Sequence, residues 1–214
     1  MKKLLFGLLL VSALGSLASC KDSSKIPAPE VTSVPLIFAT ASTDAEKAYF
    51  NFPRAAASIN NLPRQANPTR PVFEFSFGIQ NQRDVKIRAV EVYKSFRRGN
   101  NIGPRVLVGS YTSFPTTISL NSQDALTGLQ RLFFVSGQAL PTLRNLLGAT
   151  ASNANEIFAS DIIIFTFEYV LEDGSRVILT PLSEVKLAAG ATTQVISGNQ
   201  INPPYALYAK FQAQ

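Results

Sequence analysis

The 214-residue chain contains no histidine and no tryptophan, and it has a single cysteine. Without histidine it lacks the usual general base near neutral pH, the Ser-His-Asp arrangement and the commonest metal ligand. A single thiol cannot form an internal disulfide, so the fold must depend on its hydrophobic core. The absence of tryptophan removes the largest side chain on which a sugar ring can stack.

Charged residues are also scarce, at 16% of the chain, and 14 of them are acidic. The acids that lie close in sequence are Asp44 with Glu46 and Glu172 with Asp173. They fall in predicted loops or turns, where solvation explains them better than a catalytic carboxylate pair does. No glycine-rich phosphate loop precedes a helix, and no EF-hand pattern occurs. We therefore expect a protein that is not an enzyme and that has no cofactor or metal site.

The N-terminus has the layout of a secretory signal peptide. Lys2 and Lys3 precede an apolar run over residues 4–14, which is too short to span a bilayer. The run is followed by Leu17, Ala18, Ser19 and Cys20, which resemble the lipobox of bacterial lipoproteins. The resemblance implies that residues 1–19 are removed and that Cys20 is diacylated as the first residue of the mature chain. An ordinary signal peptide followed by an unmodified cysteine is the alternative.

Residues 20–35 are expected to form a lipidated and extended tether. The segment is polar, contains three prolines and has no apolar periodicity. Lys21 and Asp22 resemble the start of the signal that sends some lipoproteins of Bacteroidota to the outside of the outer membrane, although a second acid usually stands where Ser23 is. The expected location is the outer membrane, on the cell surface, with its periplasmic face as the alternative.

The net charge gives no reason to expect a nucleic acid as a partner. The formal charge of the whole chain is +6, with 20 Lys and Arg against 14 Asp and Glu. Lys2 and Lys3 leave with the signal peptide, which reduces the surplus to about +4. A surplus of this size without a run of basic residues is not the pattern of a nucleic-acid-binding protein.

Alternation of apolar and polar residues predicts that most of the remaining chain forms β-strands. The clearest strand is expected at 72–79, and a mostly apolar strand at 162–171 is expected at the centre of a sheet. Between residues 85 and 96 the apolar phase shifts by one position, which predicts a β-bulge near Arg88 and Ala89. Further strands are expected at 36–40, 48–52, 106–108, 116–120, 176–181, 185–187, 192–196 and 205–211.

The apolar spacing changes after residue 121 and predicts helix. Ser122 is expected to cap a short helix with Ala125, Leu126, Leu129 and Leu132 on one face, and a second is expected over 141–147. We therefore predict a single all-β domain over 36–214. Its expected architecture is an immunoglobulin-like antiparallel β-sandwich with one or two short helices in a connection.

Five residues are candidates for binding a ligand: Tyr93, Arg97, Arg98, Arg105 and Tyr111. Together with Lys94, the three arginines could form a basic hairpin that binds acidic sugars or lipid headgroups; alternatively, these charges keep an edge hairpin soluble. Exposed tyrosines can stack on sugar rings while their hydroxyls stay in water, and Tyr205 and Tyr208 are candidates for the same reason. Most of the phenylalanines follow the period of the core.

Several strand segments together resemble immunoglobulin-like lipoproteins of Bacteroidota, an uncharacterised family. The segments that carry the resemblance are 73–77, 90–96, 103–108, 114–118 and 167–177, within residues 72–181. Some members of the family are encoded beside starch-utilisation-type receptor pairs. The resemblance implies a non-catalytic accessory module of a nutrient-uptake system that binds a glycan or an outer-membrane receptor, and it assigns no functional residue.

A structural or adhesive surface lipoprotein that engages a protein partner is the alternative. The uptake module predicts an exposed aromatic or basic patch opposite the tether. The adhesive protein predicts no concave site and an edge strand available for pairing.

Overall fold

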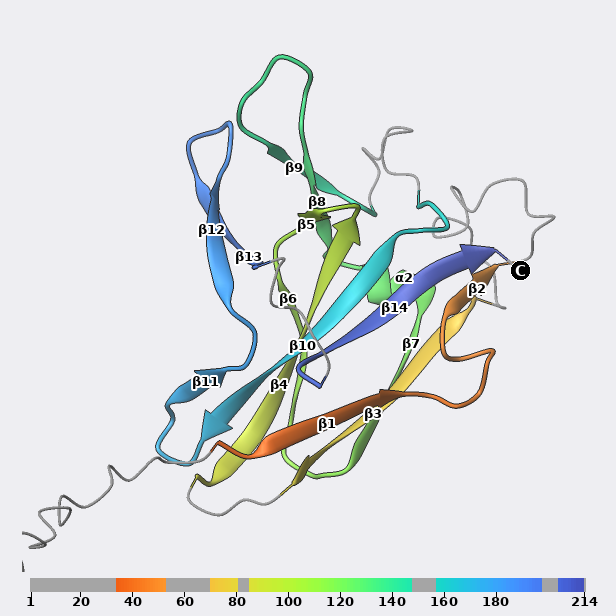
Figure 1. The fold of residues 1–214 in the computed structure, drawn as a ribbon, viewed down its shortest axis with the longest axis vertical. Helices are drawn as coiled ribbons and strands as arrows, with labels where there is room; N and C mark the ends of the chain where they lie inside the picture. The colour runs from red at the N-terminus through yellow and green to blue at the C-terminus, as the bar shows by residue number, and fades with distance from the viewer. Residues whose placement is uncertain (1–33, 53–69, 81–84, 148–156, 198–203, 214) are drawn as a thin grey trace, which may run out of the picture. The chain divides into compact units, whose positions relative to one another are not determined.

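A computed structural model describes residues 34–52, 70–80, 85–147, 157–197 and 204–213 (Figure 1). All of these residues belong to one compact unit, Ser33–Gln214. The predicted signal peptide, the lipobox, Cys20 and the tether up to residue 33 lie outside the described residues, so they remain predictions.

The predicted all-β antiparallel sandwich is confirmed, and the immunoglobulin-like type stays a prediction. One sheet has three antiparallel strands in the order β1 (Leu36–Ala41), β3 (Val72–Gln80) and β7 (Thr116–Asn121). The second sheet has seven strands. Its main order is β2 (Phe50–Phe52), β14 (Ala206–Ala213), β10 (Ile162–Leu171), β4 (Ile87–Arg98) and β5 (Asn101–Ile102); β6 (Val106–Tyr111) also pairs with β4, and β11 (Arg176–Ile178) pairs with β10. The pair β2 and β14 is parallel.

Phenylalanine rings from the two sheets meet in the core. Phe73, Phe75 and Phe77 alternate along β3 and are fully buried. The Phe73 ring stacks on the ring of Phe165 from β10 at 5.7 Å between centroids, and Phe77 lies 5.4 Å from Phe167. Each ring contributes about 2 kcal/mol or more by leaving water. The core between the sheets therefore holds the domain together without a disulfide.

Strand β10 lies at the centre of the larger sheet, as predicted, because β14 and β4 flank it. Its register places Ala89 opposite Val170 and Ile87 opposite Leu171, so Arg88 is the extra residue of a bulge in β4. The predicted bulge is confirmed. The second face of β10 is also buried, because Ile164 packs in a separate apolar cluster with Ile102, Ile196 and Ala206.

Two hairpins stand apart from the main sheets. The first pairs β8 (Gln130–Phe133) with β9 (Thr142–Asn145), and the second pairs β12 (Leu182–Lys186) with β13 (Thr192–Ile196). Figure 1 shows both hairpins at the same end of the fold, with the short strand β5 beside β8 at the base of the first hairpin.

The predicted helices are partly wrong. The first is a single turn, α2 (Ser122–Leu126), and its cap is Asn121, whose side chain accepts hydrogen bonds from the backbone N–H groups of the next turn. It ends before Gly128, which has a φ of 77°, and Leu132 belongs to β8 instead. The second helix does not form, because Thr142–Asn145 pairs with β8 and takes its hydrogen bonds from that strand. In residues 141–147, pairing with a distant strand therefore outweighs the local preference for helix.

Candidate functional site

The five predicted ligand-binding residues do not form one site. Arg97 and Arg98 are adjacent on β4, so their side chains point to opposite faces of the sheet. Arg97 lies 5.5 Å from the ring of Tyr208, whereas Arg98 pairs with Asp161. Tyr111 packs edge-on against Phe77 at the border of the core. Tyr93 and Arg105 are the two that the fold brings together, with the guanidinium 4.4 Å from the ring.

Tyr93 and Arg105 belong to a charge network on the outer face of the larger sheet. The network consists of Glu91, Tyr93, Arg105, Glu168 and Arg176. Glu91 and Glu168 stand directly opposite each other on β4 and β10. Arg176 from β11 donates to both oxygens of Glu91, at 2.5 and 2.8 Å, and Arg105 forms an ion pair with Glu168.

Hydrogen bonds complete the charge network. Tyr93 donates its hydroxyl to Glu91 at 2.6 Å. The pKa of Glu91 is lowered, first by the hydrogen bond from Arg176 and then by that from Tyr93. Burial is the main reason that the pKa of Tyr93 is raised. Two carboxylates and two guanidiniums balance each other, so the network joins β11 and the segment around Arg105 to the sheet and offers no surplus charge to a ligand.

Sequence reasoning missed the role of Glu91, Glu168 and Arg176, which are far apart along the chain. Glu91 and Glu168 each occupy a polar position in a strand, which by itself predicts a solvated face. Their meeting depends on the register between β4 and β10, and the sequence pattern does not specify that register.

A concave site lies between the two hairpins. This hairpin groove has a volume of about 400 Å³, which falls within the range of small-molecule sites. Its lining residues come from the β4–β5 turn, the β8–β9 hairpin and the β12–β13 hairpin. They are Asn100, Asn101, Ile102, Leu132, Phe134, Leu140, Pro141, Ser183, Glu184, Val185, Lys186, Val195 and Ile196.

Backbone contacts hold the walls of the hairpin groove in place. Gly103 passes so close to β8 that a Cβ atom on it would lie 1.9 Å from the carbonyl oxygen of Gln130. Pro104 forms a β-bridge with Val195 of β13. At the outer end, Ala188 donates its N–H to the carbonyl oxygen of Pro141 at 2.9 Å. The hairpins are therefore tied both to the sheet and to each other.

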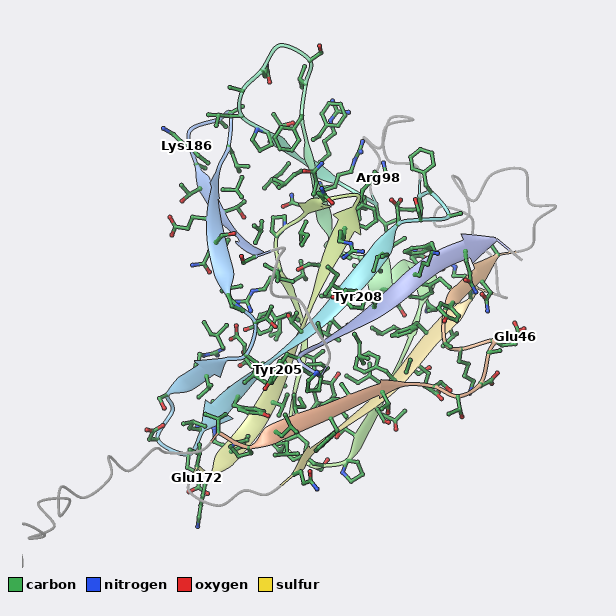
Figure 2. All side chains as sticks on the ribbon, in the orientation of Figure 1. Glu46, Arg98, Glu172, Lys186, Tyr205 and Tyr208 are labelled. Atoms are coloured by element: carbon green, nitrogen blue, oxygen red, sulfur yellow. The ribbon has the colours of Figure 1, made fainter. Side chains whose placement is uncertain are left out.

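The hairpin groove combines an apolar floor with a polar rim. Ile102, Val195 and Ile196 form a buried floor. The Phe134 side chain is 49% exposed on one wall, so its ring is available for stacking. The rim residues Asn100, Asn101, Ser183, Glu184 and Lys186 are exposed; Figure 2 shows Lys186 at the outer part of β12.

The sequence contains a weak signal for the hairpin groove. Phe133 and Phe134 precede Gly137 and Pro141, so two large apolar residues stand at the edge of a turn-rich segment that needs no core residues. The predicted tyrosines lie elsewhere, since Tyr205 and Tyr208 are absent from the lining of the groove.

Comparison with known proteins gives no guide to the function, since no family model matches the chain and neither a curated protein nor a solved structure was found to be similar to it. Within the described ranges, no helix has the length and apolar character needed to cross a membrane. The same part of the chain holds no group of three or more Cys, Asp or Glu side chains suited to a metal ion. The function is therefore argued from the geometry of the groove.

Proposed function

We propose that the protein is a lipid-anchored outer-membrane lipoprotein that binds a neutral glycan in the hairpin groove, as a non-catalytic accessory module of a nutrient-uptake system. The observation that carries the proposal is the groove itself, with an exposed phenylalanine ring beside side-chain amides. The lipobox-like sequence ending at Cys20 supports the anchor.

The chemistry of the groove suits a sugar. An aromatic ring can stack on the apolar face of a pyranose, and Phe134 presents such a ring. The side-chain amides of Asn100 and Asn101 can both donate and accept hydrogen bonds, as sugar hydroxyls require. Glu184 and Lys186 contribute one charge of each sign, so the groove favours a ligand without net charge.

The groove lies at the end of the domain remote from the point where the chain enters. The hydroxyl of Tyr169, near the end of β10, donates to the carbonyl oxygen of Pro35 at 2.8 Å. The start of β10 pairs with Arg97, which in turn pairs with Ile102 in the groove floor. The seven steps along the strand from Ile162 to Tyr169 span about 23 Å. Figure 1 shows β1 beginning at the end away from both hairpins. The groove therefore lies at the end of the described domain that is remote from Pro35.

The test measures binding of the full chain, in a detergent that contains no sugar, to a panel of neutral and acidic polysaccharides by affinity electrophoresis. Phe134→Ala is expected to weaken binding to the recognised neutral polymer about three- to tenfold, because the stacking surface is lost. Phe38→Ala is the matched control, since Phe38 is 43% exposed on β1, in the other sheet. The proposal would be contradicted if no polysaccharide bound the wild type, or if both variants lost the same amount of binding affinity.

A protein partner is the second candidate. Phe134, Val135 and Leu140 are all exposed on the same hairpin, and clustered apolar side chains of this kind favour protein contacts. In that case a neighbour in the outer membrane should crosslink to the wild type and not to Leu140→Ser, while no polysaccharide is retained.

A further inference from the structure

Strand β7 is a border strand of the smaller sheet, and β3 is its one hydrogen-bonded neighbour among the described residues (Figure 1). Just beyond the strand, Ser122 donates its N–H to the carbonyl oxygen of Pro71 at 2.9 Å. Because the backbone groups of successive residues in a strand point to opposite sides, those of Thr117 and Ser119 point away from β3. Both residues are exposed, whereas Ile118 between them is buried. The free side of β7 is therefore open to another strand.

The opposite border of the same sheet, strand β1, is already covered. Ser42, just after β1, donates its N–H to the carbonyl oxygen of Glu74 on β3 at 2.8 Å. The backbone groups of Pro35 and Ile37 therefore point away from β3. The carbonyl oxygen of Pro35 accepts the hydroxyl of Tyr169, and Ile37 is fully buried. The smaller sheet thus has one open border and one that is closed at Pro35 and Ile37.

Strand β7 lacks the features that usually protect an open border, which are charged side chains, proline and β-bulges. No charged residue occurs between Arg105 and Asp124, and the strand itself contains no proline. Its register with β3 runs without a shift. Strand β6, which is the other border strand in this uncharged segment, is bulged at Val108, where its register with β4 shifts. Of these two borders, β7 is therefore the one that can accept a further strand without a change in its own backbone.

The lack of charge favours a second copy of this chain as the added strand. When two identical strands pair antiparallel about a two-fold axis, a charged residue at the axis meets a like charge, which destabilises the pair. Strand β7 has no such residue. An axis through Ser119 brings the two Ser119 residues opposite each other and pairs Thr117 of each copy with Asn121 of the other. Pairs of short hydroxyl side chains stabilise a sheet when they stand opposite each other.

We propose that the protein forms a two-fold symmetric dimer in which the β7 strands of two copies pair antiparallel, so that one sheet contains three strands from each copy. The assembly stops at two copies, because the pairing uses the open border of each small sheet and the other border is covered. The paired strands have six residues each, so the interface is smaller than a standard one and the dissociation constant should lie at about 1–100 μM. The β7 border lies outside the hairpin groove, so the dimer does not depend on the glycan proposed there.

The first measurement is sedimentation equilibrium of the full chain in a detergent that is matched in density to the buffer. Ser119→Lys places like charges at the two-fold axis and should weaken the dimer about fivefold or more, as should Ser119→Glu. An equal mixture of the two variants should associate to within about threefold of the wild type, because opposite charges then meet at the axis. Thr40→Lys is the matched control and should dimerise as the wild type does, since Thr40 is exposed on the same face of the sheet but lies on β1.

The second measurement uses Ser119→Pro, which removes an N–H that points away from β3. The variant should lose the dimer, while its urea midpoint stays close to that of the wild type, because proline is tolerated where the N–H of a border strand is unpaired. Equal association of the wild type, Ser119→Lys and Ser119→Glu would overturn pairing at β7. A loss in both charged variants that their mixture does not reverse would overturn the antiparallel pairing of two β7 strands. A wild type that is monomeric at about 100 μM would overturn the second copy as the occupant and leave the border to a strand of another protein.

Discussion

Replacing Glu168 with glutamine removes a negative charge that lies between two guanidiniums. The Glu168 side chain is 4% exposed, and it pairs with Arg105 and, at 3.4 Å, with Arg176. Arg176 is half exposed and keeps Glu91, so it tolerates the change. The Arg105 side chain is 13% exposed and has no other ion pair among the described residues. The substitution therefore leaves the largely buried guanidinium of Arg105 without its ion-pair partner.

Breaking a buried pair from one side costs about 3 kcal/mol at the lower end of the usual range. We expect this loss for Glu168→Gln, because its amide oxygen still accepts a hydrogen bond and Arg105 still stacks on Tyr93. The assay is urea unfolding followed by circular dichroism. The midpoint should fall while the dependence on urea stays the same, which identifies a change in stability rather than in compactness.

An exposed ion pair supplies the matched control. Lys47 and Glu74 are 3.5 Å apart with side chains 44% and 27% exposed, so Glu74→Gln should cost less than about 1 kcal/mol. Adding Arg105→Gln to Glu168→Gln should recover part of the loss, with a coupling of about 2 kcal/mol. If Glu168→Gln costs no more than Glu74→Gln, or if the two losses simply add, the charge network does not stabilise the fold as argued.

Two further predictions concern the groove and a buried lysine. Gly103→Ala should lower the urea midpoint and abolish ligand retention by the hairpin groove, because its Cβ would lie 1.9 Å from the carbonyl oxygen of Gln130. Gly78→Ala is the control and should have neither effect, because its Cβ would lie 3.8 Å from the nearest atom. Lys94 is buried and donates to the carbonyl oxygen of Asp124, and burial lowers its pKa to about 8. Between about pH 8 and pH 10 the folded chain therefore binds fewer protons at Lys94 than the unfolded chain does. The free energy of unfolding should consequently rise with pH over this range, by up to about 3 kcal/mol. The rise should be absent in Lys94→Met.

The parts of the fold that were predicted from the sequence are those in which local pattern and tertiary packing agree. Alternation in β3 and the apolar run in β10 each specify a face, and the core uses those faces. The bulge at Arg88 could be predicted because a shift in phase within one strand has few other causes. The helix expected over 141–147 failed because its leucine spacing also suits a strand, and pairing with β8 decided between the two.

The candidate sites were harder to predict, because they depend on register and on contacts distant in sequence. Arg98 was predicted to bind a ligand, but it pairs with Asp161, and the basic residues near it, Arg131 and Arg144, come from segments that were expected to be helical. Tyr93 and Arg105 were expected to be free for a ligand, whereas Glu91 and Glu168 neutralise that region. A sequence pattern shows which residues share a strand face, and it does not show which face of a distant strand meets it.

The two faces of the β8–β9 hairpin carry different side chains, because side chains alternate along each strand. Leu132 lines the hairpin groove, whereas its neighbours Arg131 and Phe133 lie on the opposite face, where the Arg131 guanidinium is 5.1 Å from the centroid of the Phe133 ring. A slip of one residue in β8 would exchange the two faces and remove Leu132 from the hairpin groove. Backbone contacts oppose such a slip: Gly103 packs directly on the carbonyl of Gln130, and Leu146 donates its N–H to Leu129 at 3.1 Å. The core between the two main sheets therefore holds the domain together, while these contacts at the base of the hairpin fix the register that shapes the hairpin groove.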